Sequence, residues 1–496
     1  MNLSLLLKNF PHEKTLETLP RAYINHSVQF KKICSPEMRT KVLEEVGLNI
    51  FYFPSEMVTG CDLLSDSGVT TMTSEQWAAL HKGDEAYGSN AGYFLLRDQI
   101  RETFGEDFWH IETEESPNAF LFHQGRAAED AFFSHIGKLG DNLIIPSNGH
   151  FDTTEANITA NKIEPQNLFC EEFKDESSSS YFKGNMHIGR LQSLLETSAN
   201  RIPLVFLTIT NNTGGGQPVS LQNIREVAEL LHSYDIPLFL DACRFAENAW
   251  FIQQHESEYQ EKRIPAIVKE IFSHGDGFTM SFKKDGLVNM GGGLFIKHGG
   301  LFHKKYPKML DDLMNYQIMK EGHPTYGGLS GRDIMTLVYG LKQVTEEEYL
   351  TARIRQVQNF GKTLADAGVP VLQPFGGHAV YIDMNRFFAG TKMTPGDFGG
   401  ISFTALLLAG YGHRACELGN FAFGSYDSVS QKETFPEVNF VRLAVPRLRY
   451  EEQDLTAAAQ AIQKLFENRD KIPPVDVIYG KELSLRHFKA RFRFRA

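Results

Sequence analysis

The segment 203–240 has the pattern of a strand, a helix and a second strand in immediate succession. PLVFLTIT (203–210) is a continuous run of mostly apolar and β-branched residues, and the loop NNTGGGQP (211–218) follows it. Ser220 is a suitable N-cap for a helix, and PLFL (237–240) is a second strand-like run. Between them, apolar residues recur at helical spacing, at Ile224, Val227, Ala228 and Leu231. This order predicts two parallel strands joined by a right-handed crossover, and therefore an α/β fold.

Other parts of the chain extend this pattern into a large domain and a smaller one. Short apolar runs at 142–145 and 277–281 are expected to be further strands of the same buried sheet. Beyond about residue 340, the pattern changes to a long helix at 346–365, mixed strands and a helix at 455–466. A chain of 496 residues also exceeds one ordinary core. We therefore expect an arm and part of the small domain at 1–65, with a helix near 37–46, then a large domain at 66–340 and a small α+β domain at 341–496.

Charge and cysteine usage exclude several classes of partner. The net charge of -11 argues against a nucleic-acid surface, and the alternating phenylalanines of the basic stretch 486–495 predict a strand or packed end rather than a binding arm. No apolar run reaches the roughly 20 residues of a membrane span, and Lys8 interrupts the apolar patch of MNLSLLLKNF at the start of the chain. The five cysteines are scattered, which is typical of a reducing compartment and not of a disulfide framework or a zinc site. We expect a cytoplasmic protein that binds neither nucleic acid nor membrane.

A glycine turn follows the predicted strand at 118–122. The sequence His-Gln-Gly-Arg (123–126) leads from this strand into a helical stretch at 127–136. Such a turn presents backbone N–H groups and the positive end of a helix, so a phosphate fits there. Glycine turns before helices are common, however, and by itself this one favours a purely structural role.

Two other predicted strands end in residues with useful chemistry. Asp241 follows PLFL, where it could form an ion pair or cap a helix, or keep the pyridine nitrogen of a cofactor protonated. Lys283 and Lys284 follow the strand at 277–281; such lysines are usually solvated, but a desolvated one can form a Schiff base. The residues themselves do not choose between the two lysines. Because ligands bind beyond the carboxyl ends of strands in open α/β sheets, the three ends together predict a cofactor site.

Longer motifs extend through the same regions of the chain. They are DLLSDSG (62–68), GDEAY (83–87), HQGRAAE (123–129), FDTT (151–154), GGQPVS (215–220), DACRFAENA (241–249), SFKKD (281–285), EGHPTYGG (321–328), GGHAV (376–380) and VRLAVPR (441–447). In these motifs, and over roughly residues 50–496, the chain resembles the tryptophanase and tyrosine phenol-lyase family of β-eliminating lyases. The resemblance implies the fold-type-I, aspartate aminotransferase-like fold, with pyridoxal 5′-phosphate as cofactor and a homotetramer whose active sites are shared between subunits.

The resemblance implies a role for each matching residue. Lys284 would carry the cofactor and, once freed by the substrate amine, remove the α-proton. Asp241 would pair with the pyridinium nitrogen, and Arg442 would hold the substrate carboxylate in a bidentate fork. Tyr87 would lie near the general acid that protonates the leaving group, although taken alone it would be read as a buried structural phenol. The other cofactor contacts would be Gln124, Gly125, Arg126 and Ser281 on the phosphate, Phe151 stacked on the ring, and Asn212 and Arg244 near the phenolic oxygen.

Three positions separate the two branches of the family, and here they match tryptophanases. Asp152 would accept the indole N–H, Leu418 is aliphatic where phenol-lyases have an arginine, and His487 replaces a phenylalanine. Alone, His487 would be read as a packing or surface residue. Gly68, Glu85 and Asn289 match the positions that bind a monovalent cation, normally potassium.

The expected reaction is cleavage of L-tryptophan with water to indole, pyruvate and ammonia. Because of departures from the family pattern, the sequence does not fix the substrate, since one hydrogen-bonding group can change specificity by about 10⁴-fold. His323 adds a titratable group beside the expected ring, and Phe282 and Phe122 are bulky residues that could narrow the pocket. The alternatives are a lyase acting on tyrosine or on another β-substituted amino acid, and a catalytically silent binding protein with the same fold.

Overall fold

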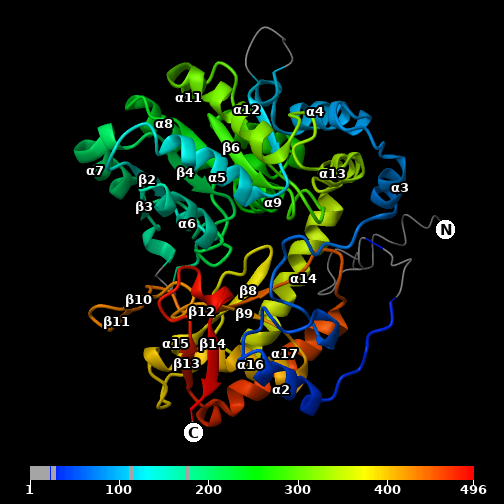
Figure 1. Cartoon of the computed structure of the whole chain (residues 1–496), viewed down its shortest axis with the longest axis vertical. Helices are drawn as coiled ribbons and strands as arrows, with labels where there is room; N and C mark the ends of the chain where they lie inside the picture. Colours follow the sequence, from blue (N-terminus) through cyan, green and yellow to red (C-terminus); the bar gives the residue numbers. More distant parts are fainter. Residues whose placement is uncertain (1–22, 24–28, 111–116, 174–177, 496) are drawn as a thin grey trace, which may run out of the picture.

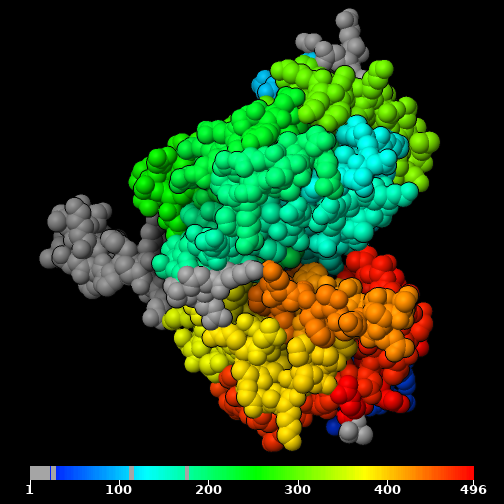
Figure 2. Space-filling model, turned by 90° about the vertical axis from the view of Figure 1, so that its left-hand side faces the viewer, coloured from blue at the N-terminus to red at the C-terminus, as the bar shows by residue number. Residues whose placement is uncertain are grey.

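The computed structural model describes residues 23, 29–110, 117–173 and 178–495, which form two lobes (Figure 1). One lobe is built on a large sheet from the central part of the chain. The other contains the C-terminal segment together with the described N-terminal residues. Helix α14 (Glu347–Asp366) runs from the first lobe into the second. Figure 2 shows the two lobes meeting across a line of contact, with residues of the C-terminal half below it.

The large sheet has seven strands in the order β1-β7-β6-β5-β4-β2-β3. β7 is antiparallel to its neighbours, and the other six strands therefore run in one direction. This direction brings the carboxyl ends of β1, β5 and β6 to one edge of the sheet. The strands are β1 (Ala119–Phe122), β2 (Ile144–Ser147), β3 (Glu164–Asn167), β4 (Val205–Thr208), β5 (Leu238–Asp241), β6 (Gly277–Ser281) and β7 (Gly292–Ile296).

Hydrophobic clusters cover both faces of this sheet. Phe206 and Phe239 pack into one cluster, whereas Val205 and Leu238, their neighbours along the strands, pack into the other. A sheet buried on both faces explains the continuous apolar runs of β4 and β5 in the sequence. The helices of this lobe are α3 (Ser74–Lys82), α4 (Ala91–Phe104), α5 (Gly125–Ile136), α6 (Asp152–Ala160), α7 (Ile188–Ser198), α8 (Leu221–Ser233), α9 (Phe245–His255), α10 (Ile264–Ser273), α11 (Leu301–Lys305), α12 (Pro307–Glu321) and α13 (Gly331–Gln343).

The second lobe is built around a three-stranded antiparallel sheet in the order β8-β12-β9. The basic C-terminal stretch forms β14, which pairs with β13, and Phe492 is buried there. This stretch is therefore a packed end of the chain. The strands and helices of the lobe are α2 (Pro36–Glu45), β8 (Ala379–Asp383), α15 (Met384–Phe387), α16 (Gly399–Tyr411), β9 (Cys416–Leu418), β10 (Ser425–Asp427), β11 (Lys432–Thr434), β12 (Phe440–Ala444), α17 (Glu452–Glu467), β13 (Val475–Tyr479) and β14 (Arg491–Phe494).

The change from one hydrophobic core to the other takes place within α14. Leu350 and Ile354 belong to the core of the large sheet, whereas Val357 and Phe360 belong to the core of the smaller one. The predicted start of the small domain at residue 341 precedes this helix. Among the described residues, no helix is both long and apolar enough to cross a membrane.

Candidate active site

A cavity of about 200 Å³ lies at the carboxyl edge of the large sheet. Its wall combines loops after the sheet strands with residues of the second lobe. Most of the predicted site residues lie together here, although they are far apart in sequence. They are Gln124, Gly125, Arg126, Phe151, Asp152, Asn212, Asp241, Arg244, Ser281, Lys284, Leu418, Arg442 and His487.

The turn between β1 and α5 forms an anion cradle in this wall. Gln124 is the N-cap of α5 but makes no side-chain capping hydrogen bond, so its side chain does not compete with an anion for the positive end of the helix. A Cβ added to Gly125 would lie 2.6 Å from the Cβ of Ser281, which leaves room there for no residue larger than glycine. Arg126 and Ser281 line the same cavity and add donors. This set of residues fits the phosphate of pyridoxal phosphate.

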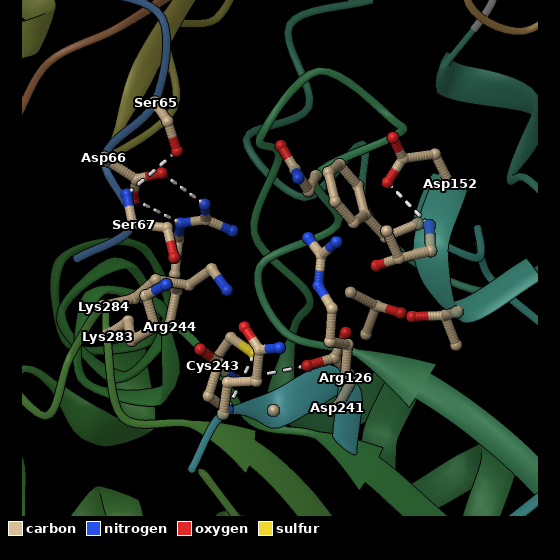
Figure 3. Close-up of a pocket in the computed structure, with 18 of the residues that line it drawn as sticks. Ser65, Asp66, Ser67, Arg126, Asp152, Asp241, Cys243, Arg244, Lys283 and Lys284 are labelled. Carbon is tan, nitrogen blue, oxygen red and sulfur yellow. Dashed lines mark hydrogen bonds and ion pairs between the residues drawn. The ribbon is translucent and has the colours of Figure 1, made fainter. Parts of the chain in front are cut away.

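Asp241 and Lys284 both line the cavity, at the ends of neighbouring strands. Figure 3 shows Lys284 and Arg126 extending into one space, with Asp241 at the base of it. Asp241 is only 6% exposed, and its Oδ1 accepts a 3.4 Å hydrogen bond from the backbone N–H of Cys243. A carboxylate, an amine and an anion cradle around one cavity fit the pyridine nitrogen, the aldehyde carbon and the phosphate of the cofactor.

Charged groups from both lobes meet beside this cavity. Arg442 lies 6.0 Å from the ring centroid of Phe151 and donates to Asn212 Oδ1 at 3.3 Å. Arg244 lines the cavity too, but its guanidinium donates to both carboxylate oxygens of Asp66, at 3.1 and 2.8 Å (Figure 3). Burial alone would raise the pKa of Asp66, but the charges of Arg244 and Arg447, with the hydrogen bond from Arg244 and other nearby groups, together outweigh this effect and hold the pKa well below its usual range. Asp66 therefore holds the guanidinium that was expected near the phenolic oxygen.

Glu129 lines the same cavity, and sequence reasoning assigned it no role. Its Oε1 accepts a 2.6 Å hydrogen bond from the hydroxyl of Thr154. Burial raises the pKa of Glu129 to about 7, and the nearby Asp241 carboxylate adds to this rise. A signal was present in the sequence, because Glu129 follows Gly125 by four residues and so lies on the same face of α5.

The far end of the cavity carries the residues that distinguish the two family branches. The Nε2 atom of His487 lies 3.4 Å from Asp152 Oδ2, and both side chains are buried. Leu418 and Cys416 also line this end. A buried carboxylate and imidazole in contact provide a polar position beside Leu418 and Cys416.

Four predicted residues lie elsewhere in this chain. Tyr87 is 70% exposed, beside the ring of His323, and so neither lines the cavity nor forms a buried structural phenol. Asn289 Nδ2 donates to the carbonyl of Gly68 at 2.9 Å, whereas the exposed Glu85 pairs with Arg332 at 3.0 Å. The three expected cation ligands are therefore not gathered within one chain.

One expectation about the cavity wall is wrong for this chain. Phe282 and Phe122 are completely buried in the hydrophobic clusters of the large sheet and do not narrow the cavity. A strand-end residue can face the core instead of the ligand, and the sequence did not distinguish the two directions. His323 also lies outside the wall; its Nδ1 is 2.8 Å from the hydroxyl of Thr325.

Comparison with known proteins agrees with this site. The family model described as beta-eliminating lyase matches residues 62–461. The chain is 39% identical over 477 residues to a tryptophanase of Rhodobacter capsulatus, covering 96% of this chain and 99% of that protein. It is 37% identical over 481 residues to a tryptophanase of Salinibacter ruber, covering 97% of each chain. A tyrosine phenol-lyase of Fusobacterium nucleatum is 36% identical over 467 residues, covering 94% of this chain and 96% of that protein.

Among solved structures, an aromatic aminotransferase from Pyrococcus horikoshii OT3 has the same fold. It matches with a TM-score of 0.54 at 14% identity, covering 83% of this chain and 96% of that chain. The predicted aminotransferase-like α/β fold is confirmed, and so is the predicted family of pyridoxal-phosphate-dependent lyases. The chain belongs to the β-eliminating lyase family.

Proposed function

We propose that this lyase cleaves L-tryptophan with water to indole, pyruvate and ammonia. The observation that carries the proposal is the composition of one cavity. Lys284 and Asp241 line it from the large lobe, and Arg442 and the Asp152–His487 pair complete it. Relatives named tryptophanase, at 37% and 39% identity over nearly the whole chain, support this choice of substrate.

Pyridoxal phosphate, when bound, supplies an electron sink for the carbanion that forms at the substrate α-carbon. Gln124, Gly125, Arg126 and Ser281 would hold its phosphate, and Phe151 would lie against its ring. Asp241 would hold a proton at the pyridine nitrogen, where the carboxylate favours the charged form. The amine of Lys284 would attach the cofactor and then accept the α-proton.

Arg442 and the far end of the cavity would orient the substrate. The guanidinium of Arg442 suits a bidentate contact with the α-carboxylate. Asp152 would accept the indole N–H, and its ion pair with His487 would hold it in place. Leu418 offers no charge to a phenolate, so this end of the cavity favours indole over phenol. A tyrosine phenol-lyase at 36% identity keeps that activity as the second candidate.

The proposal also includes a homotetramer, a potassium site and a cytoplasmic location. A homotetramer would allow the exposed Tyr87 to reach a neighbouring subunit's cavity as part of the general acid machinery, and Glu85 to approach a potassium ion at Gly68 and Asn289 there. The five cysteines are free, which supports a reducing, cytoplasmic location. Sedimentation of the purified protein tests the tetramer, and exchange of potassium for lithium during the assay tests the cation.

A product assay tests the reaction itself. The purified protein, with pyridoxal phosphate and potassium, is incubated in turn with L-tryptophan, L-tyrosine and S-methyl-L-cysteine. We expect indole and pyruvate in equal amounts from L-tryptophan. Phenol and pyruvate from L-tyrosine, with no indole from L-tryptophan, would assign the protein to the tyrosine phenol-lyases. Pyruvate from the thioether alone would make it a β-lyase for other amino acids, and a protein that stays colourless with the cofactor would be a silent binding protein.

A further inference from the structure

Tyr381 lies behind the cavity wall, on β8, and its hydroxyl reaches the amide of Asn212. The ring is buried, with 2% of its surface exposed. Its hydroxyl donates to Asn212 Oδ1 at 2.7 Å and lies 3.0 Å from the backbone carbonyl oxygen of the same residue. Sequence reasoning gave Tyr381 no role. It directly follows the GGHAV motif and does not line the cavity.

The same amide oxygen is surrounded by two further side chains. Arg442 Nη1 donates to Asn212 Oδ1 at 3.3 Å, and His378 Nε2 lies 3.1 Å from it. Burial holds the pKa of His378 well below its usual range, so the imidazole is neutral. Its Nδ1 is buried and has no partner among the described residues, which favours the tautomer with the proton on Nε2.

These neighbours determine which way the amide of Asn212 points. A guanidinium has donors and no acceptor, so the oxygen of the amide must face Arg442. Burial raises the pKa of Tyr381 to about 12, so its hydroxyl remains a donor to that oxygen at working pH. The amide nitrogen, Nδ2, must then point the other way. It makes no hydrogen bond to any described residue, and Asn212 lines the cavity, so this donor is available to a ligand.

We propose that Tyr381 is a positioning residue that holds the Asn212 amide with its oxygen on Arg442 and its NH₂ group toward the cofactor. The inference rests on the proposed function, because it takes the ligand of Nδ2 to be the phenolic oxygen of pyridoxal phosphate. The amide of Asn212 would then contact the cofactor oxygen through its NH₂ group, and through its oxygen it would contact Arg442, which would bind the substrate carboxylate. Without the hydroxyl of Tyr381, the amide loses the shortest of its three contacts, is held less firmly, and both of these interactions weaken together.

The variant Tyr381→Phe tests this because it removes only the hydroxyl. The ring keeps its contact with Phe440, whose centroid is 5.8 Å away, and Asn212 Oδ1 keeps its other two neighbours. In the holoenzyme we expect KM for the amino acid to rise about 3- to 10-fold, the range for one lost hydrogen bond. We also expect the pH midpoint of the visible absorbance of the bound cofactor to rise, because a donor that stabilises the deprotonated oxygen is lost.

Two further variants make the test specific. Asn212→Ala should change KM and the absorbance midpoint in the same directions, and the double variant should be no worse than Asn212→Ala, since both changes remove one contact. Tyr349→Phe is the matched control, because the buried hydroxyl of Tyr349 has no partner among the described residues. It should leave both readouts unchanged.

The outcomes separate this inference from the proposed function. A wild-type protein that stays colourless with added cofactor would remove the proposed function, and this inference with it. A coloured wild type whose Tyr381→Phe variant keeps its KM and its absorbance midpoint, while Asn212→Ala changes both, would overturn only the role of Tyr381. Multiplied effects in the double variant would show that the two residues act independently, which would also overturn it.

Discussion

Glu129 is a second carboxyl group in the cavity that Asp241 lines. Its pKa of about 7 in the folded protein lies above the ordinary value of 4.5, mainly because of burial. Ionising Glu129 therefore costs more in the folded chain than in the unfolded chain. As far as Glu129 is concerned, the folded protein has its full stability below about pH 4.5, where Glu129 is protonated in both states, and the free energy of unfolding falls as the pH rises through 7. The neutral acid also avoids placing a second negative charge next to Asp241.

The variant Glu129→Gln should remove this dependence on pH. Glutamine keeps an oxygen for the Thr154 hydroxyl, which donates to Glu129 at 2.6 Å. The variant should unfold at a higher urea concentration than the wild type at pH 8, with a gain of roughly 1 to 3 kcal/mol, and with no gain near pH 4.5. The exposed Glu102→Gln serves as the control for loss of one surface carboxylate. An equal gain at both pH values would show that the pKa of Glu129 is not raised in the folded protein.

The two lysines after β6 should differ in their attachment to the cofactor. Both line the cavity, and burial lowers the pKa of Lys283, to which the charges of Lys284 and Arg126 add. Lys284→Ala should lose the covalent bond to pyridoxal phosphate, and turnover with it, whereas Lys283→Ala should retain the bond. Borohydride reduction followed by peptide mass analysis locates the modified residue. Modification of Lys283 in the wild-type protein would reverse this assignment.

At the scale of single elements, the first turn of α5 depends on a glycine. A Cβ on Gly125 would lie 2.6 Å from Ser281 Cβ and 2.9 Å from Ser281 Cα, so Gly125→Ala must displace the backbone of the turn. We expect pyridoxal phosphate to bind the apoprotein about tenfold more weakly, because the N–H groups of the turn lose their alignment. Absorbance titration measures this affinity. Gly140→Ala is the control, since its Cβ would meet only Leu143 Cδ2, at 3.7 Å, and it should bind as the wild type does.

The strands that were predicted best are those whose whole length is buried. β6 begins and ends where the apolar run does, β4 lies within its run, and β5 is displaced from its run by one residue. In contrast, β3 (Glu164–Asn167) is a polar strand at the edge of the sheet, where it pairs only with β2. Its side chains are half-buried or exposed, so the sequence has no apolar run that would predict it. β4 is four residues long where the sequence suggested eight, since the flanking residues form loops that carry Asn212 and its neighbours.

The site residues that directly follow a sheet strand could be predicted from the sequence. Those whose position depends on contacts between distant parts of the chain could not. Asp241 and Lys284 follow directly from the sheet and line one cavity. The partnership of Asp66 with Arg244 joins residues 178 positions apart and left no local signal. Tyr87 could be given a role only by resemblance, and its side chain is 70% exposed.

At the scale of the whole molecule, one buried cation joins the two lobes. Arg447 follows β12 of the small sheet and is completely buried. It donates to Asp66 at 2.9 Å, to Glu247 on α9 at 2.8 Å, and to Asp285 at 2.8 Å. Asp285 comes directly after Lys284, and Asp66 holds Arg244 beside the cavity. The relative placement of the lobes and the placement of Lys284 therefore depend on the same ion-pair network.

Replacing Arg447 with methionine should destabilise the fold strongly. Three buried carboxylates would lose a shared cation, and only Asp66 and Glu247 would keep a second one, Arg244 and Arg353 respectively. Breaking such a network costs about 3 to 5 kcal/mol. Arg201→Met is the control: Arg201 pairs with Glu164 at the surface, with both side chains well exposed, and its loss should cost less than about 1 kcal/mol. Urea unfolding of the apoproteins measures both changes without any contribution from bound cofactor.

The pH dependence of this loss separates a broken ion-pair network from a simple packing defect. Burial already raises the pKa of Asp285 to about 6 against the pull of Arg447, and without Arg447 the pKa must rise further. A carboxyl group with a raised folded-state pKa loses stability as the pH increases from its unfolded value through the folded one. The deficit of Arg447→Met should therefore be larger at pH 8 than at pH 5. A deficit of equal size at both pH values would mean that Arg447 stabilises the contact between the lobes by its volume and not by its charge.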